Sequence, residues 1–255
     1  MNYFPVIIPF VFGTVIGSFL NVVIYRLPKD LSLIQPRSFC PKCNASIPIY
    51  RNIPVLSFLL QGGRCVECKE KISFQYPLVE ILTGVVWWWC FTHQPIYEAA
   101  IVSMVVSALI AVAWIDSRTF LIPLSLIVFS LAVLGIGIIL HVFSIQHVLW
   151  GIFVGVFCLS FIMGISYVIS KRQGMGYGDL QLGLVLGIWL GPINMALTLF
   201  VASSLSLLIW IYISINKGFD KNRPLPFAPF LVIAAVFIYT VDFYSSSGLF
   251  LQFIW

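Results

Sequence analysis

Residues 97–115 read YEAAIVSMVVSALIAVAWI, and Glu98 is the only charged residue in this run. About 20 apolar residues in a helix are enough to span a bilayer, so the run predicts a transmembrane helix. The rest of the chain agrees, because 60% of its 255 residues are hydrophobic and only 9% are charged. Soluble domains carry about 25% charged residues, and no soluble fold of this size could bury so much apolar surface.

Seven further stretches resemble this run in length and apolar character. The sixth of the eight is short and is closed by Gly191-Pro192. All eight stretches are approximately 4–25, 77–92, 97–115, 121–141, 148–170, 180–190, 195–215 and 229–251. The sequence therefore predicts an all-α polytopic membrane protein with about eight transmembrane helices.

The basic residues indicate the orientation of these spans. Eight spans place both termini on one side, and the connections around 26–76, 116–120, 171–179 and 216–228 on the other. All fourteen Lys and Arg residues fall in these four connections, so the positive-inside rule makes that side the cytosol. Both termini are then non-cytosolic. The net charge of +5 is spread over span flanks, so we expect contact with membrane lipid and none with nucleic acid.

One polar segment interrupts the apolar pattern. We divide the chain into a first transmembrane helix (1–26), a cytosolic insert (27–76) and a seven-helix membrane domain (77–255). The insert contains two CxxC pairs, Cys40/Cys43 and Cys65/Cys68. This spacing is typical of a zinc ribbon with a structural Zn²⁺ closed by four thiolates. A pair of disulfides is the alternative, which a reducing cytosol disfavours.

Three carboxylates lie at the predicted edges of the membrane: Glu80, Asp116 and Asp179. Ionisable groups at such positions are costly and often functional. Asp116 and Asp179 fall at the same cytosolic depth, which suits an aspartyl protease pair that shares a proton. Each could instead be an interfacial residue or a helix N-cap. Glu80 has two interpretations, an interfacial carboxylate paired with an Arg or a residue near a cofactor or substrate amine.

Several motifs together resemble the bacterial type IV prepilin leader peptidase and N-methyltransferase family, whose members are GxGD-type membrane aspartyl proteases. The resemblance covers most of the chain. The motifs that carry it are Gly17-Ser18-Phe19-Leu20-Asn21 through Arg26-Leu27-Pro28, the two CxxC pairs, Asn52-Ile53-Pro54-Val55-Leu56-Ser57, Tyr76-Pro77-Leu78-Val79-Glu80, Asp116 through Ile122-Pro123, Gly176-Tyr177-Gly178-Asp179, and Pro226-Phe227-Ala228-Pro229-Phe230.

The resemblance implies an enzyme of the bacterial inner membrane with its active site toward the cytosol. It would cleave leader peptides from type IV prepilins or the pseudopilins of type II secretion, with Asp116 and Asp179 as catalytic residues. It would then methylate the new N-terminal amine with S-adenosyl-L-methionine, because the cysteine insert is typical of bifunctional members. Gly63 and Glu80 are the implied cofactor-binding residues.

The chain departs from the family pattern at three positions. Arg51 stands where an acidic residue is frequent, Gln181 where Lys is usual, and Ala228 where Gly is preferred. Arg51 lies in the insert and therefore bears on methylation more than on cleavage. Two other hypotheses stay open: a peptidase whose methyltransferase part does not function, and a non-enzymatic zinc-ribbon membrane scaffold.

Overall fold

A computed structural model describes residues 7–35, 38–170, 176–220 and 224–246. Some predictions fall outside these residues. They concern both chain termini, Gly174 and Met175 just before the second aspartate motif, and five of the basic residues that set the orientation: Arg37, Lys171, Arg172, Lys221 and Arg223.

The regular secondary structure of the described chain is all helical, as predicted. It contains no named strand, and its only β-type pairings are two isolated bridges inside the insert. The helices are α1 (Ile7–Arg26), η1 (Leu27–Lys29), η2 (Ile49–Arg51), α2 (Leu56–Leu60), α3 (Gln75–His93), α4 (Ile96–Thr119), α5 (Leu124–Ile139), α6 (Ile145–Ser170), α7 (Tyr177–Lys217) and α8 (Ala228–Ser246).

The number of membrane spans stays a prediction. Among the described residues, five helices are long and apolar enough to cross a membrane, namely α1, α4, α6, α7 and α8. Each of the eight predicted stretches, in its described part, coincides with a helix, but two of them share α7. The backbone of α7 leaves the helical region at Gly191, with a φ of 71°, and Pro192 follows. Proline at this position removes a backbone donor, which helps to separate the two halves.

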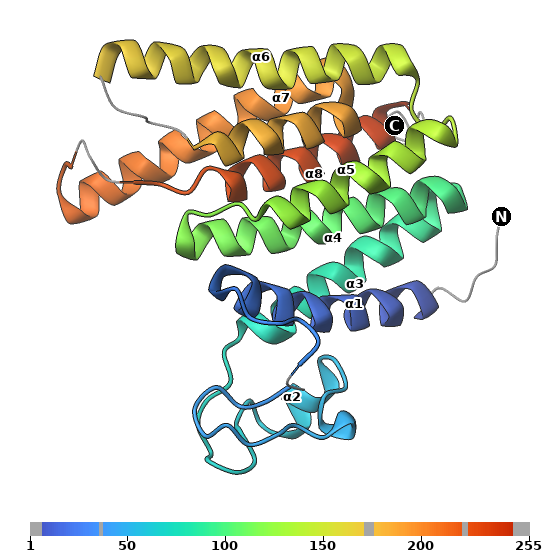
Figure 1. The fold of residues 1–255 in the computed structure, drawn as a ribbon, viewed down its shortest axis with the longest axis vertical. Helices are drawn as coiled ribbons and strands as arrows, with labels where there is room; N and C mark the ends of the chain where they lie inside the picture. The colour runs from blue at the N-terminus through green and yellow to red at the C-terminus, as the bar shows by residue number, and fades with distance from the viewer. Residues whose placement is uncertain (1–6, 36–37, 171–175, 221–223, 247–255) are drawn as a thin grey trace, which may run out of the picture. The chain divides into compact units, whose positions relative to one another are not determined.

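The chain divides into two compact units, residues 1–111 and 112–255. In the first unit α1 packs along α3, and the insert connects them (Figure 1). The helices approach closely at Gly13 and Gly17. A Cβ at Gly13 would lie 2.7 Å from the Cβ of Trp87, and one at Gly17 would lie 2.7 Å from the Cα of Glu80. Glycine at this four-residue spacing permits the backbone contact that stabilises helix pairs in membranes.

In the second unit α6 packs against α7 by the same means. Gly151 and Gly155 of α6 face Gly187 and Gly183 of α7, and a Cβ at Gly155 would overlap the backbone carbonyl oxygen of Gly183. α7 also packs against α8 and α5. The α6–α7 contact places the N-terminal half of α7, which begins with the second aspartate motif.

This packing yields a first prediction. Gly155→Ala should lower the free energy of unfolding in detergent by about 1–3 kcal/mol, because the added methyl group forces the two backbones apart. Gly164→Ala in the same helix is the matched control, since nothing lies within 4 Å of a Cβ there. Thermal unfolding of both variants in one detergent measures the difference. Equal melting temperatures would contradict the close packing.

Candidate active site and metal centre

Asp116 lies in the last turn of α4 and is only 5% exposed. Its Oδ2 accepts a hydrogen bond of 3.2 Å from the backbone N–H of Ala228, the first residue of α8. The motif around Pro226 and Ala228 thus has a local function: it presents the N-terminus of a helix to this carboxylate. The positive end of the α8 dipole points at Asp116.

Asp179 is the third residue of α7 and is 9% exposed. Its Oδ2 accepts a hydrogen bond of 3.2 Å from the backbone N–H of Gly176. The side chain therefore turns back over the start of its own helix. Gly178 fits tightly against the neighbouring loop, because a Cβ there would lie 2.8 Å from the Cβ of Ile122. A glycine at this position lets the helix start approach the segment that follows Asp116.

The two aspartates line one cavity of about 850 Å³. Most of the other lining side chains are large and apolar, and the connection before α8 forms part of the wall. The lining consists of Asp116, Phe120, Leu121, Ile122, Leu124, Leu159, Ile162, Gly176, Tyr177, Gly178, Asp179, Gln181, Ser203, Ser206, Leu207, Trp210, Pro224, Leu225, Pro226 and Phe227. Two buried carboxylates in one apolar cavity can hold and exchange a proton.

Part of this wall has no signal in the sequence. Ser203, Ser206 and Trp210 come from the far half of α7, yet they line the same cavity as Asp179. A straight helix of 41 residues would be about 60 Å long, so the chain has to reverse near Gly191 (Figure 1). Gln181 faces the cavity too, where the resembling family usually has Lys.

The four insert cysteines form a cluster in the first unit. Their sulfur atoms all lie within 4.8 Å of one another, and all four are free thiols. Sγ of Cys40 lies 3.9 Å from Sγ of Cys68, and Sγ of Cys43 lies 4.0 Å from Sγ of Cys65. Tetrahedral Zn²⁺ with zinc–sulfur bonds of about 2.3 Å separates its sulfurs by about 3.8 Å. The cluster therefore fits a structural zinc ion.

The backbone of the two CxxC turns is the same. The N–H of Cys40 donates to the carbonyl of Ala45, and the N–H of Cys65 donates to the carbonyl of Glu70, both at 2.9 Å. Asn44 and Lys69 occupy matching left-handed positions. Each turn ends in an isolated antiparallel bridge, Phe39 with Ser46 and Arg64 with Lys71. Two equivalent knuckles facing each other are the arrangement that closes a four-thiolate site.

The thiols differ in acidity. Backbone hydrogen bonds from Cys68 and Glu67 lower the pKa of Cys65 to about 7. A backbone hydrogen bond from Glu70 lowers the pKa of Cys68, but desolvation and the thiols of Cys43, Cys65 and Cys40 raise it to about 12. Thiolates this close repel one another, so they need a cation to ionise together.

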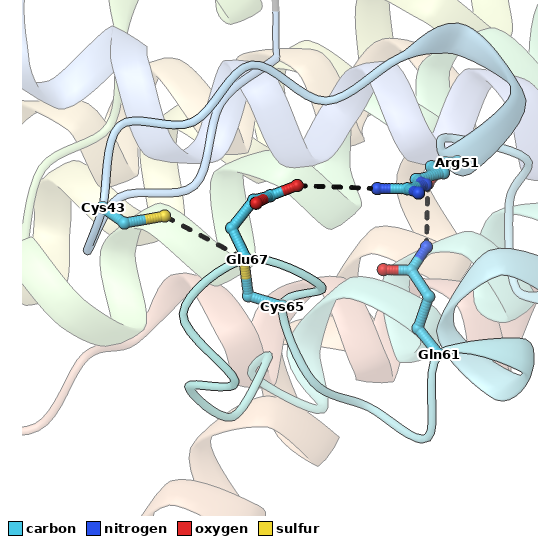
Figure 2. A network of polar contacts seen from close by, with 5 residues as sticks. All are labelled: Cys43, Arg51, Gln61, Cys65 and Glu67. Atoms are coloured by element: carbon cyan, nitrogen blue, oxygen red, sulfur yellow. Dashed lines mark hydrogen bonds and ion pairs between the residues drawn. The ribbon is translucent and has the colours of Figure 1, made fainter.

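Arg51 ties the middle of the insert to the second CxxC turn. One of its guanidinium nitrogens lies 3.9 Å from Oε1 of Glu67, and its backbone carbonyl accepts from the Gln61 side chain at 3.2 Å (Figure 2). Both charged side chains are partly exposed, so the ion pair contributes at most about 1 kcal/mol. The basic residue that departs from the family pattern thus has an acidic partner in this chain.

Glu80 is buried and anchors the insert to α3. Its Oε2 accepts a hydrogen bond of 2.7 Å from the backbone N–H of Val55. Val55 has a φ of 60°, a costly conformation for a β-branched residue. Gly63, with a φ of 65°, forms the turn between α2 and the second knuckle, and a Cβ there would lie 3.0 Å from the Phe58 ring.

Two family models match consecutive parts of the chain. Residues 11–94 match the family described as bacterial peptidase A24 N-terminal domain, and residues 103–211 match the type IV leader peptidase family. No solved structure matches.

Several curated bacterial proteins are similar over nearly their whole length. A prepilin leader peptidase/N-methyltransferase of Neisseria gonorrhoeae is 31% identical over 95% of this chain and 92% of its own. One of Stutzerimonas stutzeri is 33% identical, with 88% and 86% covered. A type 4 prepilin-like proteins leader peptide-processing enzyme of Escherichia coli is 34% identical, with 88% and 89% covered. The chain therefore belongs to the type IV leader peptidase family, a family of aspartic peptidases.

Proposed function

We propose that this protein cleaves the leader peptide of type IV prepilins or pseudopilins at the cytosolic face of the bacterial inner membrane. It then methylates the new N-terminal residue with S-adenosyl-L-methionine. The observation that carries the proposal is the shared cavity of Asp116 and Asp179. The names of the relatives support it, since they process prepilins and bear the N-methyltransferase designation.

The two aspartates divide the work of peptide hydrolysis. One carboxylate takes a proton from a water molecule, while the other is protonated and polarises the scissile carbonyl. Each carboxylate has one oxygen engaged by a backbone N–H, from Ala228 or Gly176, which fixes its direction. The apolar lining suits the hydrophobic N-terminal helix of a prepilin, whose basic leader stays in the cytosol.

The insert serves the methylation step. In this proposal Zn²⁺ on Cys40, Cys43, Cys65 and Cys68 holds the insert together, and the methyl donor supplies its methyl group to the substrate amine. We assign Gly63 and Glu80 to the site for S-adenosyl-L-methionine. Glu80 acts by holding the insert to α3 through Val55.

The proposed topology has about eight spans, with residues 27–76 as a cytosolic zinc-ribbon insert. The positions of the Lys and Arg residues favour an orientation with both termini outside the cytosol. Five apolar helices among the described residues support a multi-pass membrane protein.

The decisive experiment incubates the purified protein in detergent with a prepilin peptide and S-adenosyl-L-methionine, and weighs the products. Bifunctional activity yields a shortened peptide that is heavier by one methyl group. A shortened peptide without the methyl group would indicate a peptidase alone. An unchanged peptide would favour the zinc-ribbon scaffold.

Glu80 offers a second prediction. Glu80→Ala should lower the methylation rate about tenfold and spare cleavage, because it leaves the N–H of Val55 without its buried acceptor, a loss of about 1–3 kcal/mol. Glu80→Gln is the matched control, since its amide oxygen can still accept from Val55. Methylation of an already shortened peptide measures the effect. If Glu80→Gln were as impaired as Glu80→Ala, the charge rather than the anchor would be the essential feature.

A further inference from the structure

The short helix α2 exposes most of its apolar side chains. Leu59 is 66% exposed and Leu60 is 79% exposed, and Leu56 beside them is 48% exposed. They belong to the polar insert, not to a predicted span. A compact group of exposed leucines on a small module marks a surface that binds another protein or a membrane.

The position of α2 favours the membrane as the partner of this surface. Phe58 of α2 packs edge-on against Phe74, with 6.3 Å between the ring centroids. Phe74 is 67% exposed and directly precedes α3, whose outward residues Ile81, Leu82 and Val85 are exposed and apolar. In the predicted topology α3 starts at the cytosolic edge of the membrane. The leucines of α2 therefore lie beside the point where the chain enters lipid.

Two cations lie in the second CxxC turn, which follows α2 in the chain. Arg64 and Lys71 face each other across an isolated antiparallel bridge, which the N–H of Ile72 reinforces by donating to the carbonyl of Gly63 at 2.8 Å. Both are exposed, and within the described part of the chain neither forms an ion pair. The insert as a whole (27–76) has seven basic and three acidic residues. Paired cations without an acidic partner favour an anionic surface.

We infer that α2 with Arg64 and Lys71 is an interfacial anchor that binds anionic phospholipid of the cytosolic leaflet. Leu56, Leu59 and Leu60 enter the boundary between headgroups and acyl chains, as the apolar face of an interfacial helix does. Arg64 and Lys71 contact the lipid phosphates. The anchor would hold the insert against the membrane surface in addition to the link from Glu80 to Val55.

Photo-crosslinking in lipid nanodiscs tests the apolar contact. The full-length protein carries p-benzoylphenylalanine at Leu60, or at the exposed Lys42 of the first CxxC turn as the control. After irradiation, intact mass should show a phospholipid adduct for the Leu60 position and none for the Lys42 position. Equal adducts at both positions, an adduct with another protein, or no lipid adduct at Leu60 would each overturn the inference.

Lipid preference tests the charges. Nanodiscs made of equal parts phosphatidylglycerol and phosphatidylcholine should give Leu60 adducts enriched in phosphatidylglycerol. Each surface cation favours an anionic membrane by about fivefold, so Arg64→Gln with Lys71→Gln should reduce the enrichment by up to about 25-fold. Lys42→Gln with Lys69→Gln removes the same charge elsewhere in the insert. This control should keep most of the phosphatidylglycerol enrichment.

Two further measurements exclude simpler explanations. The metal content of each variant shows that the insert is folded. Added inorganic phosphate should leave the enrichment in place, whereas its loss would indicate a site for the free ion and overturn the lipid assignment. An unchanged enrichment in the Arg64 and Lys71 variant would also overturn it.

Discussion

Asp116→Asn and Asp179→Asn should each lower the rate of leader cleavage by about 10²–10⁴-fold, the usual contribution of general acid–base catalysis. Asparagine keeps the shape of the side chain and an oxygen that can accept from Ala228 or Gly176. The fold should therefore survive, but the amide can neither take a proton from water nor donate one to the scissile carbonyl. Cleavage of a prepilin peptide by purified protein measures the loss.

The controls separate catalysis from folding. Asp242→Asn changes an exposed carboxylate of α8 that accepts from Asn194, and it should cleave at the wild-type rate. The double variant should be about as inactive as either single one, because residues that act as a unit have non-additive effects. Both single variants should still methylate a peptide that lacks its leader. Near-normal cleavage by either single variant would rule out the two-aspartate mechanism.

The sequence was sufficient to predict the helices of the membrane domain, because long apolar runs in lipid must satisfy their backbone internally. It also predicted that Asp116 and Asp179 lie at the same membrane depth. Both residues line one cavity, and their catalytic role stays a prediction. The boundary between the sixth and seventh stretches was visible as Gly191-Pro192, and the positive φ of Gly191 explains why a long helix can still turn back there.

Other features of the sites have no pattern that a single sequence could reveal. Ser203 and Ser206 are ordinary small polar residues of an apolar helix until the reversal of α7 places them in the cavity wall. The contact of Glu80 with Val55 depends on one backbone N–H in a strained turn. Val55 is β-branched, and such a residue favours an extended backbone with a negative φ. Both features depend on tertiary contacts between segments distant in the sequence.

Cys40→Ser should abolish methylation while leaving cleavage largely intact. Zinc–thiolate binding contributes about 10 kcal/mol or more to the folding of a small module, and the insert has little apolar core of its own. Loss of one ligand opens the four-thiolate site and releases both knuckles. The anchored turn at Val55 and the turn at Gly63 then lose their fixed positions. The aspartate cavity is built from residues of the second unit alone, so its chemistry does not depend on the metal.

Cys158→Ser is the matched control, because Cys158 is a free thiol of α6 that is remote in sequence from both CxxC turns. Elemental analysis should give one zinc per chain for the wild type and for Cys158→Ser, and a large loss for Cys40→Ser. Product masses should then show a shortened, unmethylated peptide for the Cys40 variant, and a strong chelator should reproduce this result. If cleavage fell together with methylation, the insert would also support the peptidase. If methylation survived without metal, methylation would not need a folded insert, because a module this small cannot keep its fold without the staple.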